Sequence, residues 1–377
     1  MIGMKQMLEA LVRNYPRETK HLAQIFKDST TSYKYAWFLA IMAIINRDPS
    51  LETISLTKIF AEMVSIVWYP VCFFKLSLGI QDILQREILS IFENEKLQPD
   101  LNIAILREYV LSKQDIIEKM DFLKKYVPYR FLTPWFDKSL NGKKDHEKNN
   151  IIRTLANGSQ NSEYPTPYFF DSAMENIIVN QCWKGFIFDN FQVIHSFAEY
   201  NFVQYLQSRN PNSPNVINKL HPPRERQLQA ARNFWEAVRK EFLKAGNGHF
   251  FVDIYSGQQL DGKFSIDHFL PWSFLAHDLL WNLIPINKRT NSSKRDSIPE
   301  LERYIPRLAN LHYQGIHAIE ERKFLEDYLI NFKTEPNELL KKSKEEFESL
   351  YWETFVPQTQ IAINQGFPHS WVYQENF

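Results

Sequence analysis

The feature that most constrains this chain is a set of polar residues spaced through its C-terminal third. Asp267 and His268 stand side by side at the end of an apolar segment, and Pro271 follows them. Two asparagines, Asn282 and Asn291, come further along. An isolated Asp-His pair is usually a surface or capping feature. The whole set, placed after a segment rich in turn residues, instead predicts that the local fold gathers these side chains into one site.

The residues around this set predict two short strands followed by a helix. Residues 250–255 are apolar and β-prone, and residues 264–267 are expected to form the returning strand. Ser-Gly and Asp-Gly dipeptides between the two segments favour turns. Residues 291–296 are expected to contain the start of the helix, with Ser292 or Ser293 as its N-cap.

This arrangement resembles the HNH endonuclease family, whose catalytic unit is a ββα fold that holds one divalent metal. The spacing is similar to that of the HNH domain in CRISPR RNA-guided DNA-cutting enzymes, and the resemblance covers about residues 225–300. The Tyr-Ser-Gly that opens the turn segment is also similar. The matching positions are Asp267, His268, Pro271, Asn282, Asn291 and Lys294.

The resemblance implies a role for each residue, and the side-chain chemistry suits these roles. His268 would activate water, because imidazole titrates near neutral pH. Asp267 and Asn291 would hold Mg²⁺ or Mn²⁺, since hard cations prefer oxygen ligands. Asn282 would help to hold the loop and the histidine in place. Lys294, one helical turn after Asn291, would touch a flanking phosphate.

Cysteine usage departs from many HNH proteins, which carry two Cys-x-x-Cys pairs around a structural zinc. This chain has only Cys72 and Cys182, neither near the motif, so no structural zinc is expected. Asn291 stands where the last histidine of the family lies, which favours Mg²⁺ or Mn²⁺ over a softer metal. Two widely spaced cysteines also suit a reducing cytoplasm, the expected location.

Several assignments within the motif have alternatives. Asn287 rivals Asn291 as the metal-binding asparagine, although the following Ser-Ser-Lys favours Asn291. Asn282 fits direct contact with the reacting groups and a purely scaffolding role about equally. His277 and Asp278 lie between the Asp-His pair and Asn282, and they are expected to belong to a solvated loop.

Basic residues flank the motif on both sides in the sequence. Residues 219–244 form a basic, helix-rich lead-in that contains Arg239. A second cluster follows Asn287. Each cluster alone would be a solvated helix face, but their position around the motif favours a phosphate-binding surface. The residues expected to contact nucleic acid are Arg239, Lys288, Arg289, Lys294 and Arg295.

Charge and hydropathy limit the partners of the chain. Lysine plus arginine number 44 and aspartate plus glutamate number 44, so the formal net charge is zero. Because non-specific nucleic-acid binding usually needs a basic protein, DNA contact must come from local patches or be helped by a partner. Apolar runs at 35–45 and 63–74 are shorter than the roughly 20 residues that span a membrane. Both are therefore predicted to be buried helices. Residues 1–20 show no signal peptide.

The length of 377 residues suggests two or three domains. Residues 1–127 predict a helical domain that senses, regulates or binds a partner. Residues 128–209 predict a mixed connecting segment, 210–310 the nuclease domain and 311–377 a C-terminal helical segment. The expected fold class is α+β and predominantly α-helical, with a ββα-metal unit embedded among helices.

The connecting segment is expected to contain a solvated loop over 137–150, strands at 168–170, 176–180 and 186–188, and a helix over 189–208. Helical apolar spacing elsewhere predicts helices at 4–15, 21–27, 32–46, 56–68, 81–95, 101–111, 113–126 and 338–351.

Two classes of function follow from these features. The first is a metal-dependent endonuclease that hydrolyses phosphodiester bonds of DNA, with RNA as an open alternative. Its expected setting is bacterial restriction or anti-phage defence, with activation by a ligand or companion protein through residues 1–127. The second is a non-catalytic module that uses an HNH-like fold to bind nucleic acid or protein. The complete set of Asp267, His268 and Asn291 favours the first class.

Overall fold

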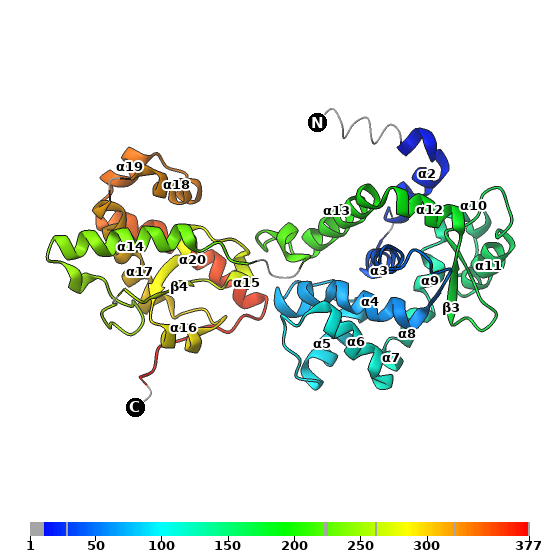
Figure 1. Ribbon diagram of the computed structural model, residues 1–377, viewed down its shortest axis with the longest axis horizontal. Helices are drawn as coiled ribbons and strands as arrows, with labels where there is room; N and C mark the ends of the chain where they lie inside the picture. Colours follow the sequence, from blue (N-terminus) through cyan, green and yellow to red (C-terminus); the bar gives the residue numbers. More distant parts are fainter. Residues whose placement is uncertain (1–10, 28, 222–224, 261, 320, 376–377) are drawn as a thin grey trace. The chain divides into compact units, whose positions relative to one another are not determined.

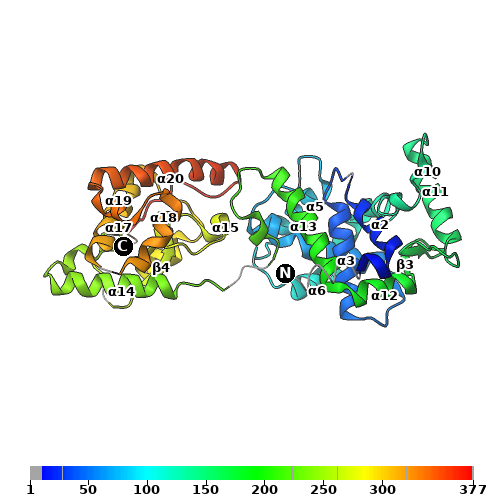
Figure 2. The same ribbon diagram turned by 90° about the horizontal axis from the view of Figure 1, so that it is seen from above.

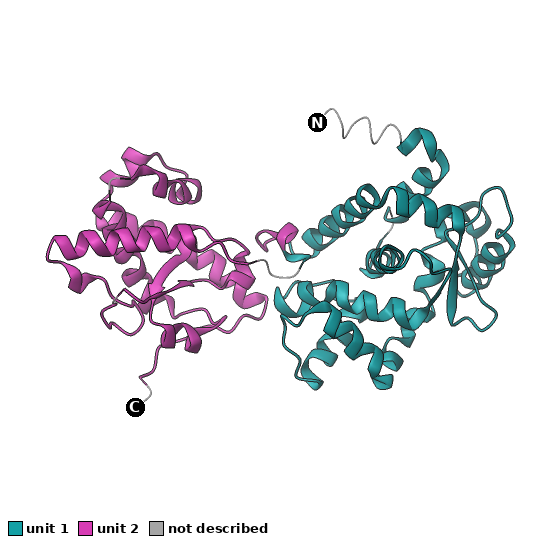
Figure 3. Ribbon diagram, viewed as in Figure 1, with its two compact units in different colours: residues 1–211, 219–222 teal, residues 212–218, 223–377 magenta. Residues whose placement is uncertain are grey.

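The computed structural model describes residues 11–27, 29–221, 225–260, 262–319 and 321–375 (Figure 1). The chain forms two compact units (Figure 3). Unit 1 comprises residues 1–211 and 219–222, and unit 2 comprises residues 212–218 and 223–377. The predicted segments 1–127 and 128–209 thus fall in the same compact unit. Their functional separation stays a prediction.

Unit 1 is built around a buried central helix. α3 (Tyr33–Arg47) lies between α4 (Leu56–Trp68) and α13 (Phe191–Arg209), and α6 (Ile103–Ser112) packs on α4 (Figure 1). The central position of α3 follows from its sequence, which is apolar on nearly every face. The remaining helical elements are α2 (Pro16–Ile25), η1 (Tyr69–Phe73), α5 (Ile83–Asn94), α7 (Gln114–Lys119), α8 (Asp121–Lys124), α9 (Val127–Arg130), η2 (Thr133–Trp135), α10 (Asp137–Leu140), α11 (Asp145–Gly158) and α12 (Gln181–Asp189).

One apolar segment of unit 1, Leu56–Phe73, is long and apolar enough to cross a membrane. It comprises α4 and the π-helix η1, and 83% of it is buried inside the structure. Burial by neighbouring helices explains its composition, which agrees with the expected core helix.

Most of the helices expected in residues 11–127 are present with shifted ends. The helix expected at 21–27 begins earlier, at Pro16, and the one expected at 113–126 is divided into α7 and α8. Residues 4–10 of the first expected helix lie outside the described residues.

A small antiparallel sheet completes unit 1. Its strand order is β1 (Thr53–Ser55), β3 (Asn176–Val179), β2 (Tyr168–Phe170). The strands expected at 168–170 and 176–180 are thereby confirmed.

Two predictions for the connecting segment are wrong. The strand expected at 186–188 belongs to α12, whose N-terminus is capped by Asn180. The loop expected at 137–150 contains α10 and the start of α11. The Glu147 carboxylate accepts a hydrogen bond from Lys144 N at 2.9 Å and so helps to begin α11. Local capping therefore outweighs the polar composition of this segment.

Unit 2 wraps helices around a two-stranded antiparallel sheet, β4 (Ser265–His268) with β5 (Leu283–Ile286). Figure 2 shows β4 between α14 (Gln229–Lys244) and α20 (Lys344–Asn364). α14 packs on β5 and on α17 (Leu301–Ala318), which packs on α20. The other helical elements described are η4 (Gly248–Phe250), α15 (Trp272–Leu275), η5 (Leu280–Asn282), α16 (Lys288–Lys294), η6 (Arg322–Leu325), α18 (Glu326–Phe332) and α19 (Pro336–Lys341). The short helix η3 (Val216–Lys219) has its first three residues in unit 2 and Lys219 in unit 1.

These elements confirm the predicted fold class, α+β and predominantly α-helical. The single helix expected over 338–351 is corrected to two, α19 and α20, because Ser343 starts a new helix. Its hydroxyl accepts from Glu346 N at 3.2 Å, while Ser343 N donates to the Glu346 carboxylate at 2.7 Å.

Candidate active site

The β4–β5 pair places the Asp-His motif at the centre of unit 2. Asp267 pairs with Ile284 and His268 with Leu283 across the two strands. Both motif side chains are buried, with residue exposures of 7% and 3%. The expected hairpin between 250–255 and 264–267 does not form, because the partner of β4 is the apolar run that becomes β5.

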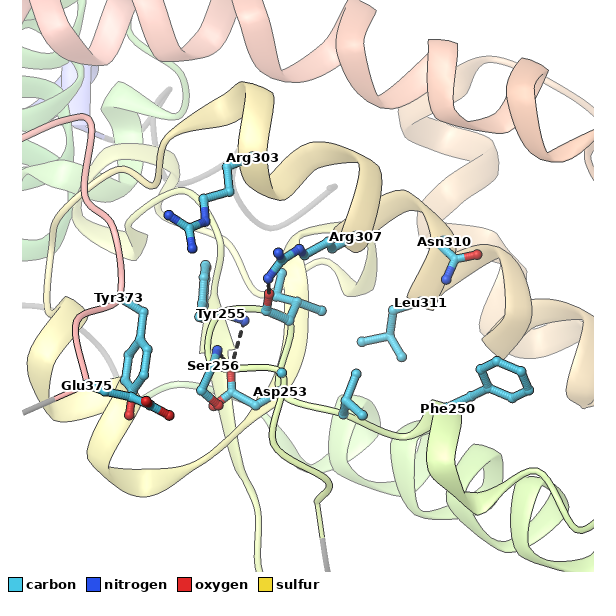
Figure 4. Close-up of a pocket in the computed structure, with 13 residues that line it drawn as sticks. Phe250, Asp253, Tyr255, Ser256, Arg303, Arg307, Asn310, Leu311, Tyr373 and Glu375 are labelled. Atoms are coloured by element: carbon cyan, nitrogen blue, oxygen red, sulfur yellow. Dashed lines mark hydrogen bonds between the residues drawn. The ribbon is translucent and has the colours of Figure 1, made fainter. Parts of the chain in front are cut away.

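A buried carboxylate explains why the segment after residue 250 turns instead of extending. Asp253 Oδ1 accepts hydrogen bonds from Tyr255 N at 2.9 Å and Ser256 N at 3.3 Å. Its Oδ2 accepts from Asn287 N at 3.0 Å and from the Thr290 hydroxyl at 2.7 Å. Asp253 therefore closes the tight turn visible in Figure 4 and ties that turn to the start of α16. Sequence reasoning gave this aspartate no role.

The same contacts correct the predicted start of the helix. α16 begins at Lys288 after the N-cap position Asn287, earlier than the expected N-cap at Ser292 or Ser293. Asn291 therefore lies inside α16, half-buried, one turn before Lys294. Asn287, the rival candidate, donates its side-chain amide to the Gln258 carboxamide at 3.3 Å.

His268 is oriented by an aspartate that the sequence analysis placed in a solvated loop. His268 Nε2 lies 2.8 Å from Asp278 Oδ1, and the Asp278 side chain is only 17% exposed. Asp278 Oδ2 accepts a hydrogen bond from Gln227 N at 2.8 Å. The expectation of a solvated Asp278 is therefore wrong. The sequence did show that Asp278 lies within the motif, a few residues before Asn282. Hydrophobic periodicity, however, does not indicate which residue a charged side chain contacts.

The charge state of Asp278 determines which tautomer the neutral His268 imidazole adopts. Burial raises the pKa of Asp278. The hydrogen bonds from His268 and Gln227 N, together with the nearby charge of Arg226, lower this pKa by more than burial raises it, so the net shift is downward. An ionised carboxylate only accepts hydrogen bonds. His268 Nε2 consequently carries the proton in the neutral imidazole, and Nδ1 keeps its lone pair.

Lys294 reaches the Asp-His pair from α16 and is fully buried. Its ammonium donates to the His268 carbonyl oxygen at 2.7 Å and lies 3.1 Å from Asp267 Oδ2. The second contact is an ion pair and not an aligned hydrogen bond, and no described residue donates an aligned hydrogen bond to Asp267 Oδ2. The structure thus places Lys294 inside the site and not at the surface expected for phosphate contact.

Asn282 anchors the chain immediately after the motif. Its side chain is completely buried, with Oδ1 accepting from Leu270 N at 2.9 Å and Nδ2 donating to Leu270 O at 3.0 Å. Its backbone carbonyl accepts from Phe269 N at 2.8 Å. These contacts correspond to the scaffolding alternative for Asn282.

The basic residues expected to bind nucleic acid occupy different elements. Lys288 and Arg289 are exposed on α16, and Arg295 is exposed directly after it. Arg239 is half-buried on α14. Three of these cations therefore lie on or directly after α16, whereas Arg239 lies on a different helix, α14.

The donor set can be compared with what a divalent metal requires. Among the described residues no group of three or more His, Cys, Asp or Glu side chains has the geometry of a metal site. Asp267 and Asn291 provide hard oxygen donors, and the buried Asp267 Oδ2 lacks an aligned donor. The chemistry of these two oxygen donors suits a hard cation that keeps several of its waters, and a cation at Asp267 would have to displace the Lys294 ammonium.

Sequence comparison with known families finds a match within unit 2. Residues 253–300 match the family model described as HNH endonuclease, which confirms the resemblance. The matched segment contains the Asp253 turn, the β4–β5 pair and α16. Searches of curated proteins and of solved structures each gave no match. The match supports a nuclease-type function, use of a divalent metal and nucleic-acid binding in general.

Proposed function

We propose that unit 2 is a metal-dependent endonuclease that hydrolyses phosphodiester bonds of DNA, with His268 as its general base. The observation that carries this proposal is the 2.8 Å contact between His268 Nε2 and the ionised Asp278. It leaves Nδ1 as the basic nitrogen, which can take a proton from a water molecule that attacks phosphorus.

Asp278 and Lys294 position the base without touching the substrate. The Asp278 charge stabilises the imidazolium that forms when Nδ1 accepts the proton. Lys294 holds the His268 carbonyl oxygen at 2.7 Å, and this contact fixes the end of β4. Asn282 fixes the two residues that follow.

Asp267 and Asn291 are the proposed metal ligands. Mg²⁺ or Mn²⁺ bound there would polarise the phosphate and stabilise the leaving 3′ oxygen. Asp267 Oδ2 supports this assignment, because it forms an ion pair with Lys294 but accepts no aligned hydrogen bond and so keeps the capacity to bind a cation. The exposed cations of α16 would contact flanking phosphates.

The biological part of the proposal is a bacterial restriction or anti-phage defence effector, cytoplasmic, that needs an activating ligand or a companion protein. Zero net charge supports low intrinsic affinity for DNA, which is consistent with gating. Residues 1–127 would carry the sensing, regulatory or partner-binding role. No structural zinc is proposed.

The proposal is tested by plasmid nicking with the full chain in Mg²⁺, Mn²⁺ and EDTA. His268→Ala should abolish cleavage, while the matched control His369→Ala, at an exposed histidine, should keep it. Cleavage that survives in His268→Ala would refute the assignment. If neither protein cleaves, the non-catalytic alternative is tested by Mn²⁺ binding, because it predicts no metal site that is lost in Asp267→Ala.

A further inference from the structure

A polar pocket of about 590 Å³ lies in unit 2 beside the HNH segment (Figure 4). Its walls are α17 and the loop over residues 252–257. Arg303 and Arg307 extend from α17 toward this loop, and Tyr373 and Glu375 lie at one end of the pocket. None of the roles assigned above uses these side chains.

The two arginines are held in place and remain accessible. They lie one helical turn apart and are exposed, and their guanidinium carbons stand 5.6 and 5.7 Å from the centre of the Tyr304 ring. Arg307 Nη1 also donates to the Ile254 carbonyl oxygen at 3.0 Å. Within the described part of the chain neither arginine forms an ion pair. Two oriented guanidinium groups therefore lack an anionic partner.

The acidic residues that line the pocket do not cancel this charge. Asp253 is fully buried, and four hydrogen bonds within the turn and to α16 already occupy its carboxylate. Glu375 is exposed at the rim. Within the described residues, two arginines without an ion pair thus face one exposed carboxylate. Planar guanidinium groups suit phosphate better than an apolar ligand.

Tyr255 connects the pocket to the Asp-His motif. It lines the pocket, is only 2% exposed, and its ring centre lies 6.3 Å from that of Phe269. Burial, together with the charges of Asp267 and Asp253, raises the pKa of the Tyr255 hydroxyl, so this group stays neutral. Tyr255 therefore contacts both the pocket and Phe269, the residue that follows His268.

We propose that this pocket binds a backbone phosphate of the nucleic-acid substrate close to the cleaved bond. Arg303 and Arg307 would hold the phosphate oxygens, and Glu375 would oppose binding by charge repulsion. This inference rests on the proposed function, because it places a second phosphate site beside the HNH site.

Binding is measured with the full chain carrying His268→Ala, in EDTA, so that cleavage plays no part. The probe is a fluorescently labelled DNA duplex, followed by anisotropy over a salt series. Arg303→Gln should weaken binding about tenfold, the equivalent of one charge-assisted hydrogen bond. It should also make the slope of log K against log salt shallower by about 1. Arg303 is the cleaner variant, since Arg307 also holds the Ile254 carbonyl.

Two further variants separate a phosphate site from a general loss of charge. Glu375→Gln should strengthen binding. Arg322→Gln, an exposed arginine outside the pocket, should leave affinity and slope nearly unchanged. The inference is overturned if Arg303→Gln behaves like Arg322→Gln, if its salt slope is unchanged, or if the parent binds no duplex at low salt. Cleavage of plasmid by the chain with His268 intact is scored separately, so failure of the proposed function is distinguishable.

Discussion

The contact between Asp278 and His268 predicts a selective loss of catalysis in Asp278→Asn. The substitution keeps the shape of the side chain but removes the negative charge of the carboxylate, which lies 2.8 Å from His268 Nε2 and accepts its hydrogen bond. A hydrogen bond to a charged group contributes about 1.5–3 kcal/mol. Loss of that amount in the transition state lowers kcat about 10- to 100-fold. A carboxamide that donates to Nε2 would hold the opposite tautomer and deepen the loss to about 10⁴-fold.

The assay is single-turnover cleavage of a labelled duplex under the metal conditions that support plasmid nicking. The dissociation constant for the duplex should stay unchanged, because Asp278 does not face the substrate. Asp296→Asn, at an exposed carboxylate just after α16, is the matched control and should cleave like the parent. Equal cleavage rates for Asp278→Asn and Asp296→Asn would refute the positioning role.

The lowered pKa of Asp278 adds a dependence of stability on pH. Burial raises this pKa, but the hydrogen bonds from His268 and Gln227 N outweigh it. A carboxyl group with a depressed folded-state pKa stabilises the fold above its unfolded value of about 3.9, and this contribution disappears as pH falls through the folded value. The difference in unfolding free energy between the parent and Asp278→Asn should therefore be largest at pH 7 and should vanish at an acidic pH below the folded-state pKa of Asp278. Urea denaturation at both pH values measures it, and a difference that persists in acid would contradict the shift.

Two further substitutions test the scaffold around the motif. Asn282→Ala leaves both backbone groups of Leu270 unpaired and should lower the free energy of unfolding by about 2–4 kcal/mol. The control Asn233→Ala, at an exposed asparagine, should change this free energy little. Equal urea midpoints for the two variants would contradict the prediction. Lys294→Met leaves the Asp267 carboxylate buried without its cation, so the unfolding temperature should fall in EDTA and rise with Mn²⁺ by more than in the parent. An equal Mn²⁺ shift in both proteins would argue against metal binding at Asp267.

Sequence pattern predicted the helical class, two strands of unit 1 and the position of the HNH segment, because these depend on local periodicity and spacing. It did not predict the partner of β4, since two apolar runs, 250–255 and 283–286, compete for it. The choice is made by Asp253, whose four hydrogen bonds turn the first run away. Such a choice depends on contacts distant in sequence, which no local pattern encodes.

The roles of Asp278 and Lys294 were missed for a related reason. Charged residues in a polar loop or at a helix end are exposed in most proteins, so burial is not the expected outcome. Here each finds a partner that only the folded chain provides: His268 for Asp278, and the Asp267 carboxylate with the His268 carbonyl for Lys294. The positions of Asp267, His268 and Asn282 could be identified from spacing, but the contacts of Asp278 and Lys294 could not.

A two-stranded sheet is marginally stable by itself, so the precision of this site must come from its anchors. Asp253 joins the preceding turn to α16, and Asn282 joins the residues after His268 to β5. Asp278 instead contacts the imidazole directly. The anchoring residues therefore fall into two groups. Substitution of Asp253 or Asn282 should first lower the stability of the fold, whereas substitution of Asp278 should first lower the cleavage rate. Stability and single-turnover rate, measured on the same variants, distinguish the two groups.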